Sequence, residues 1–283
     1  MFFHAHPDDE ALLTAGTMAR LARQGHRVVL VLATSGEGGL AAPELRGQGL
    51  GEVRHREAHA AARILGCARV VFLGYADSGH APVPHRDGAA GQPAECPVPF
   101  AGADVEEAAG RLAEVLTEER AELLTVYDPA GGYGHPDHLQ VHRVGYRAAA
   151  LAGTPVVLEA TVDRDVLLRG LRAASWLYRF PPHFDRDAFR QAYAPGADIT
   201  HRVSVRGLWR TKRASMAAHA SQATGGDSVR TLAALRRLPG LVFRYALGTE
   251  WYIQRGLPPG TVLDDPLATV PRQVAAAPRA RGK

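Results

Sequence analysis

The sequence predicts an α/β fold with a Rossmann-like, mostly parallel sheet and helices on both faces of that sheet. In the first 161 residues, short apolar and β-branched runs alternate with helical patterns, as they do in βαβ units. The run 27–34 is almost entirely apolar, which is typical of a strand that is buried on both faces. Gly25 and Gly66 end two of the helical patterns.

The expected elements of this first half follow one another along the chain. We expect strands at 2–5, 27–34, 69–73, 123–127 and 155–161, and helices at 9–24, 52–65, 105–119 and 136–151. The stretch 78–103 is rich in Pro and Gly, which indicates a loop or lid. In open sheets of this kind, ligands bind beyond the carboxyl ends of the strands.

After residue 161 the alternation becomes less regular. Further elements are expected at 164–178 (helix), 200–205 (strand) and 208–221 (helix). We therefore expect an α/β catalytic core at 1–161 and a C-terminal elaboration at 162–268 that caps the core and completes its cleft. The Ala-, Pro- and Arg-rich tail at 269–283 is expected to be disordered.

The composition is that of a soluble globular protein, with 46% hydrophobic and 22% charged residues. No apolar run is long enough to span a membrane, and the first residues lack the basic region of a signal peptide. Two cysteines, Cys67 and Cys96, are too few for a disulfide framework, so we expect a cytoplasmic protein. The net charge of +4 is diffuse, which argues against a nucleic-acid partner. The sequence does not specify the oligomeric state, and a homo-oligomer is one of the possibilities.

Two motifs carry the chemistry. The first, His6-Pro7-Asp8-Asp9-Glu10, stands where the first strand gives way to a helix. Helix capping accounts for one carboxylate at such a position, but three in succession repel one another unless a cation lies among them. Glu10 is expected to cap the helix or to support the metal ligands.

The second motif runs from Gly131 to His138, with the sequence GGYGHPDH, and it follows the strand at 123–127. Both motifs would meet at the same edge of the sheet. His6 and Asp9 offer a close pair of ligands, and His138 completes a set of three nitrogen and oxygen donors with an open position for water. This is the pattern of a catalytic zinc site, and we expect one Zn²⁺ per subunit. The donor set also permits Fe²⁺, Mn²⁺ or Co²⁺.

With these residues in place, the chain resembles the PIG-L/LmbE-like family of zinc-dependent N-acetylglucosamine deacetylases, and its second motif is most similar to the mycothiol-pathway members. Weaker similarities lie at 34–38 (TSGEG), at Arg54 with Glu57, at 77–79 (DSG) and at 218–222 (AHASQ) preceded by Lys212. The resemblance covers about residues 1–225.

Roles follow for the remaining residues of the motifs. Ligation by Asp9 leaves Asp8 beside the activated water as general base, and the resemblance implies the same division. His135 is the candidate donor to the oxyanion or to the leaving amine, expected to be a cation oriented by Asp137. Tyr133 is a second candidate donor to the oxyanion.

The resemblance also implies contacts to sugar hydroxyls from Arg54 and Asp77. Read from the sequence alone, Arg54 could equally belong to a solvated helix face and Asp77 to an Asx-turn. His219 is left open between a polar core residue and a wall of the cleft.

The expected function is hydrolysis of the N-acetyl group of an N-acetylglucosamine-type amino sugar that is linked to an inositol, a natural product or another group. One alternative is an amidase of the same chemistry that acts on a thiol conjugate or a larger acyl group. A second is a metal-dependent sugar-binding protein without turnover, which the presence of both Asp8 and His135 disfavours. A nucleotide-binding Rossmann protein is disfavoured because no GxGxxG follows either of the first two strands.

Overall fold

The computed structural model describes residues 1–39, 49–79, 97–177, 188–223 and 231–271. Within them, seven strands form one sheet in the order β3-β2-β1-β4-β5-β7-β6. Their bounds are β1 Phe2–His4, β2 Val29–Thr34, β3 Arg69–Tyr75, β4 Leu123–Tyr127, β5 Val156–Thr161, β6 His201–Ser204 and β7 Thr249–Ile253. Strands β1 to β5 pair in parallel, whereas β7 is antiparallel to both β5 and β6. This confirms the predicted α/β fold with a mostly parallel sheet.

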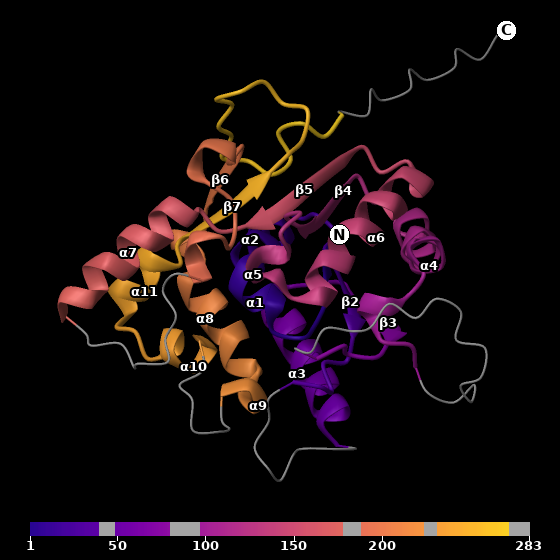
Figure 1. The fold of residues 1–283 in the computed structure, drawn as a ribbon, viewed down its shortest axis with the longest axis horizontal. Helices are drawn as coiled ribbons and strands as arrows, with labels where there is room; N and C mark the ends of the chain where they lie inside the picture. Colours follow the sequence, from indigo (N-terminus) through magenta and orange to yellow (C-terminus); the bar gives the residue numbers. More distant parts are fainter. Residues whose placement is uncertain (40–48, 80–96, 178–187, 224–230, 272–283) are drawn as a thin grey trace, which may run out of the picture.

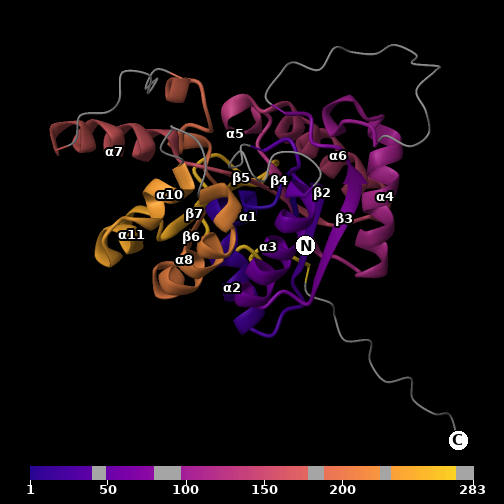
Figure 2. The ribbon, with the colours of Figure 1, turned by 90° about the horizontal axis from the view of Figure 1, so that it is seen from below.

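Helices cover both faces of the sheet (Figures 1 and 2). Their bounds are α1 Asp9–Leu13, α2 Ala15–Arg23, α3 Leu50–Leu65, α4 Val105–Glu118, α5 Gly131–Gly134, α6 Pro136–Ala152, α7 Arg164–Leu177, α8 Trp209–Ala218, α9 Ala220–Ala223, α10 Thr231–Arg236 and α11 Gly240–Ala246. Short 3₁₀ turns lie at η2 Phe100–Gly102, η3 Ala188–Arg190, η4 Gly196–Asp198 and η5 Arg206–Leu208.

Alternating side chains of the central strands divide the core in two, as the period of two in a strand requires. Phe3 and Val31 point to the side covered by α4 and α6, while Phe2, Leu30 and Leu32 point to the side covered by α2 and α3. Both strands are buried along their whole length, and their residues are apolar except for the last one of each, His4 and Thr34.

Two of the expected helices are interrupted in the structure, and α5, α10 and α11 were not expected. The expected helix 9–24 is broken at Thr14, which leaves the helical conformation (φ −133°) and whose hydroxyl lies 2.8 Å from His4 Nε2. The expected helix 208–221 is broken at His219 (ψ 60°). In both cases a buried polar contact of one side chain interrupts the helix, which the periodicity of the sequence does not reveal.

Strand β7 was not expected. The region 162–268, expected as a cap, supplies β6 and β7 to the same sheet, while α7 and α11 lie at the end of the molecule opposite α4 (Figures 1 and 2). Of the expected disordered tail, residues 269–271 are described, and Val270 packs against the core. The remaining tail and much of the expected loop 78–103 lie outside the described residues.

Candidate active site

The candidate site lies beyond the carboxyl ends of the parallel strands. His6 follows β1, Asp77 follows β3, and the segment from Gly131 to His138 follows β4. Both motifs therefore meet at one edge of the sheet, and the polar side chains of this edge are largely buried.

The three expected metal ligands converge on one point. Asp9 Oδ2 lies 3.3 Å from His6 Nδ1 and 3.4 Å from His138 Nε2, and the three ligand atoms lie within 4.8 Å of one another. Tetrahedral zinc with bonds of about 2.0–2.2 Å places its ligand atoms about 3.3–3.6 Å apart. The spacing of these donors therefore fits a zinc ion at their centre.

The hydrogen bond of the His138 ring supports this fit. Its Nδ1 lies 3.2 Å from the carbonyl oxygen of Gly131, which can only accept, so Nδ1 carries the proton. Its Nε2 is buried, has no hydrogen-bond partner among the residues that the structure describes, and directs a lone pair toward Asp9. Two lone pairs that face each other repel unless a cation lies between them. The glycine at 131 is required here, because a Cβ atom would lie 3.0 Å from the Cβ of His138.

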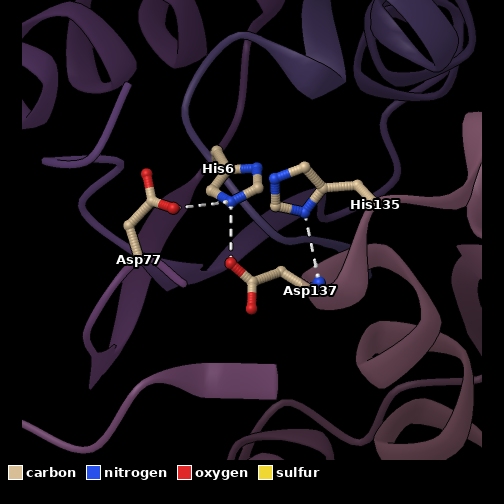
Figure 3. Close-up of side chains that lie close together, drawn as sticks. All are labelled: His6, Asp77, His135 and Asp137. Atoms are coloured by element: carbon tan, nitrogen blue, oxygen red, sulfur yellow. Dashed lines mark hydrogen bonds and ion pairs between the residues drawn. The ribbon is translucent and has the colours of Figure 1, made fainter. Parts of the chain in front are cut away.

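Two carboxylates hold the opposite side of the His6 ring (Figure 3). His6 Nε2 lies 3.0 Å from Asp137 Oδ2 and 3.5 Å from Asp77 Oδ1. Although burial disfavours a charged ring, the hydrogen bonds to Asp137, Asp77 and Asp9 raise the pKa of His6 well above its ordinary value. The negative charge of these carboxylates, which favours the protonated ring, also attracts a divalent cation. With Nε2 donating to Asp137, Nδ1 is directed to the metal position.

Asp137 therefore has a different partner from the one we expected. Its carboxylate accepts hydrogen bonds from Ser78, at 2.5 Å from the hydroxyl and 3.0 Å from the backbone N–H, as well as facing His6. Toward His135 it is the backbone N–H of Asp137 that donates, to Nδ1 at 3.2 Å (Figure 3). Because Asp137 begins α6, its N–H is available to cap, whereas its side chain points to the neighbouring strand end.

The surroundings of His135 also disfavour the cation that we expected there. The pKa of His135 is lowered to about 4, first by burial and then by the nearby rings of His6 and His138. A ring that accepts at Nδ1 and is neutral carries its proton on Nε2. His135 can therefore still donate a hydrogen bond, but as a neutral imidazole.

Tyr133 lies at the rim of the site. It belongs to α5, where Gly131, Gly132 and Gly134 all have positive φ, and the residue is 52% exposed. Its ring centroid is 5.1 Å from that of His138. The aromatic ring thus lies against one expected ligand in an edge-to-face arrangement, and about half of the residue is exposed to solvent.

Asp8 is held in an uncommon backbone conformation. Its φ of 98° lies in the left-handed region, which a residue with a Cβ enters at a cost of about 1–2 kcal/mol. Its Oδ1 lies 3.1 Å from Arg54, and its side chain is 23% exposed. Desolvation raises the pKa of Asp8 to about 6, although the Arg54 guanidinium opposes the shift.

This strain gives a prediction that is independent of any metal. Asp8→Gly should be more stable than Asp8→Ala by about 1 kcal/mol, because glycine adopts positive φ without a Cβ clash. The order should reverse at helical Asp9, where glycine is the poorer residue by about 0.5–1 kcal/mol. Denaturant unfolding of the four metal-free variants measures both differences. Equal stability of the two Asp8 variants would show that the backbone there is unstrained.

Arg54 lies beneath the site and is only 3% exposed. It donates to the carbonyl oxygens of Gly36, at 2.6 Å, and of Pro7, as well as to Asp8. A side chain bound in this way ties α3 to the loop after β2 and to the loop that carries Asp8. These three bonds use three of the five N–H donors of the guanidinium, so Nε–H and the second N–H of Nη1 are left for the expected sugar contact.

The glycines of the TSGEG loop make room for this guanidinium. A Cβ on Gly36, whose φ is 68°, would lie 2.5 Å from the Arg54 side chain, whereas one on Gly25, whose φ is 87°, would meet nothing within 4 Å. Gly36→Ala should therefore cost about 2–4 kcal/mol of unfolding free energy, against about 1–2 kcal/mol for Gly25→Ala, which has only the backbone strain. Chemical denaturation compares them, and equal losses would contradict the packing role of Gly36.

Asp77, the other expected sugar contact, has a side chain only 4% exposed. Its Oδ1 accepts the N–H of Gly79 at 2.8 Å, which forms the Asx-turn that the sequence left open. Despite burial, hydrogen bonding to His6 and the charge of that ring lower the pKa of Asp77. Asp77 is thus placed to orient His6 at the edge of the site.

Three further polar residues of the site had no role assigned from the sequence. Ser78 fixes the Asp137 carboxylate, His219 pairs with Glu10, and Tyr127 donates or accepts at 2.9 Å from His4 Nδ1. The DSG and AHASQ similarities contained Ser78 and His219, so these motifs were the available signal. For Tyr127, which stands in an apolar strand, the sequence offered none.

Comparison with known proteins identifies relatives over most of the chain. A family model described as GlcNAc-PI de-N-acetylase (PIG-L) matches residues 1–149. The 1D-myo-inositol 2-acetamido-2-deoxy-alpha-D-glucopyranoside deacetylase of Streptomyces scabiei is 38% identical over 254 residues, which cover 78% of this chain and 75% of that protein. The protein of the same name from Nocardiopsis dassonvillei is 39% identical over 248 residues, covering 79% and 84%.

Solved structures share the fold at lower identity. N,N'-diacetylchitobiose deacetylase from Pyrococcus horikoshii matches with a TM-score of 0.53 and 20% identity, covering 89% of this chain and 80% of that one. GalB, a 4-carboxy-2-hydroxymuconate hydratase from Pseudomonas putida, matches with a TM-score of 0.53 and 19% identity, covering 92% and 96%. Since a hydratase and a deacetylase match equally well, the fold alone does not specify the reaction. Among the described residues, no helix combines the length and the apolar character that crossing a membrane requires.

Proposed function

The chain belongs to the PIG-L family of de-N-acetylases, and from this we propose that it is a metal-dependent hydrolase that removes the N-acetyl group of an N-acetylglucosaminyl conjugate. The first substrate to consider is 1D-myo-inositol 2-acetamido-2-deoxy-alpha-D-glucopyranoside, on which the relatives are named as acting. The observation that carries the proposal is the convergence of His6, Asp9 and His138, with the lone pair of His138 Nε2 directed at a carboxylate.

In this proposal His6, Asp9 and His138 hold one Zn²⁺ per chain. Zinc in such a site supplies a Lewis acid that activates water and polarises the amide carbonyl. Fe²⁺ satisfies the same donors, so the identity of the metal is part of the proposal. Asp77 and Asp137 orient the His6 ring from its other side, as carboxylates commonly do for ligating histidines.

The remaining residues divide the proton transfers. Asp8 removes a proton from the attacking water, and the same proton is available for the leaving amine once the C–N bond breaks. In this proposal His135, neutral and protonated on Nε2, donates a hydrogen bond to the developing oxyanion, and Tyr133, whose ring lies near those of His135 and His138, is a second donor. Arg54 holds Asp8 rather than the sugar. A cytoplasmic location and an amino-sugar substrate complete the proposal.

Release of a primary amine from purified protein tests the function. We expect turnover of the glucosaminyl-inositol substrate to exceed that of N,N'-diacetylchitobiose and of an analogue with a butyryl in place of the acetyl group. Preference for the butyryl compound would favour the amidase alternative instead. Absence of hydrolysis of all three by zinc-loaded protein would contradict the proposal.

A further inference from the structure

A buried ion pair links the C-terminal region to the loop that carries Asp8. His219 Nε2 lies 2.6 Å from Glu10 Oε1, and both side chains are fully buried. The second oxygen of the same carboxylate, Glu10 Oε2, accepts the backbone N–H of Asp8 at 2.9 Å. One carboxylate therefore joins two residues that are 211 positions apart, since Glu10 is two residues from Asp8 and 209 from His219.

The hydrogen bond to Asp8 falls where the backbone is strained. Left-handed residues with a Cβ persist only when their surroundings fix them. The N–H of Asp8 points to Glu10, and the carbonyl of the preceding Pro7 accepts from Arg54. If the Glu10 carboxylate turned away, the peptide between Pro7 and Asp8 could rotate, and the Asp8 side chain would leave its place beside Asp9.

His219 is itself held in a defined position. It occupies the break between α8 and α9, and the residue two positions later, Ser221, donates from its backbone N–H and its hydroxyl to Glu57 of α3, both at 2.7 Å. Within the described part of the chain, the other ring nitrogen of His219, Nδ1, has no hydrogen-bond partner. Among these described residues, the ring therefore makes one directed polar contact, which is with Glu10.

We propose that His219 and Glu10 are positioning residues that hold Asp8 in its left-handed conformation beside the metal site. His219 fixes the rotamer of Glu10, and Glu10 fixes the backbone of Asp8. The inference rests on the proposed role of Asp8 as the general base. The AHASQ segment would thus contribute to catalysis although it does not contact the substrate.

Two amide variants separate this role from simple filling of the core. In His219→Gln the side-chain nitrogen reaches the place of Nε2, whereas in His219→Asn it reaches only the place of Nδ1. His201→Asn is the matched control, because His201, at the start of β6, is also fully buried, and its Nδ1 bonds to the hydroxyl of the preceding residue, Thr200. Hydrogen exchange of the peptide that contains Asp8 is measured beside kcat, KM and bound zinc.

We expect His219→Asn to accelerate exchange of the Asp8 amide and to lower kcat, each by about 10- to 100-fold, with KM and zinc content unchanged. For His219→Gln, the exchange rate of the Asp8 amide and kcat should each stay within about threefold of the parent values, and His201→Asn should change neither the exchange rate nor kcat. Equal losses in the Gln and Asn variants, or unchanged exchange in both, would overturn the inference. If His219→Asn does not fold, Glu10→Asp, which keeps the charge but cannot span both partners, must show the same fast exchange. Because exchange needs no substrate, a parent protein without deacetylase activity would refute the proposed function and leave this test intact.

Discussion

Asp8→Asn should retain the metal and lose about 10²–10⁴-fold in kcat. The amide keeps the size of the carboxylate and can still face Arg54, but it cannot take a proton from water, and removal of a general base has this magnitude. The ligand atoms of His6, Asp9 and His138 do not include Asp8, so metal content should remain at the level of the parent. Metal analysis and steady-state kinetics on the same preparation provide both numbers.

Asp104→Asn is a suitable control for this experiment. Asp104 caps α4, where its Oδ1 accepts the N–H of Glu107 at 2.9 Å, and asparagine caps helices equally well. It should change neither activity nor metal content. If Asp8→Asn lost the metal along with activity, Asp8 would be a ligand, and the roles of Asp8 and Asp9 would have to be exchanged.

The second large effect is expected for His138→Ala, which should lose the metal and reduce turnover to the background rate. Removal of a partner that merely orients a ligand weakens metal binding about 10- to 100-fold, so loss of the ligand itself should exceed about 100-fold. His142→Ala, one turn further along α6, is matched to it. The Nδ1 of His142 bonds to the carbonyl of Tyr127 at 2.9 Å, away from the three ligand atoms.

Competitive zinc titration against a chromogenic chelator distinguishes the two variants. The His142 variant should bind zinc like the parent protein, and the His138 variant should not. Metal binding of parent strength in His138→Ala would exclude this histidine from the ligand set. The second group of potential ligands among the described residues, His6 with Asp77, His135 and Asp137, would then be the place to search.

The sequence predicted the parallel sheet because burial on both faces leaves a direct trace. A run such as 27–34 has no polar face, which is typical of a strand in a parallel sheet that is covered by helices on both sides. The two motifs were likewise predicted to meet, because parallel strands bring their carboxyl ends to one edge. Convergence of His6, Asp9 and His138 follows from these two facts and the spacing along the chain.

The partners of the carboxylates could not be predicted in the same way. Asp137 stands two residues from His135, so sequence proximity favoured that pairing, yet side chains at a helix start point in directions that spacing does not define. The burial of Arg54 could not be predicted either. An arginine in a helix is usually exposed, and here it is buried because glycines of the neighbouring loop leave space for its guanidinium. The pairing of His219 with Glu10 depends on a tertiary contact that no local pattern encodes.

Glu250 of β7 has a consequence for how the protein is made. Its carboxylate accepts the backbone N–H groups of Gly16 and Thr17, in the first turn of α2, at 2.8 and 2.7 Å, and it pairs with Lys212 at 2.6 Å. During translation the chain must grow by 234 residues before Gly16 meets this acceptor, which takes roughly 10–50 s at ordinary elongation rates. Until then the start of α2 stays uncapped and the edge of β5 lacks its neighbour. A ribosome-bound chain that displays only the first two hundred residues should thus be a client for chaperones and proteases, whereas the released chain should resist both.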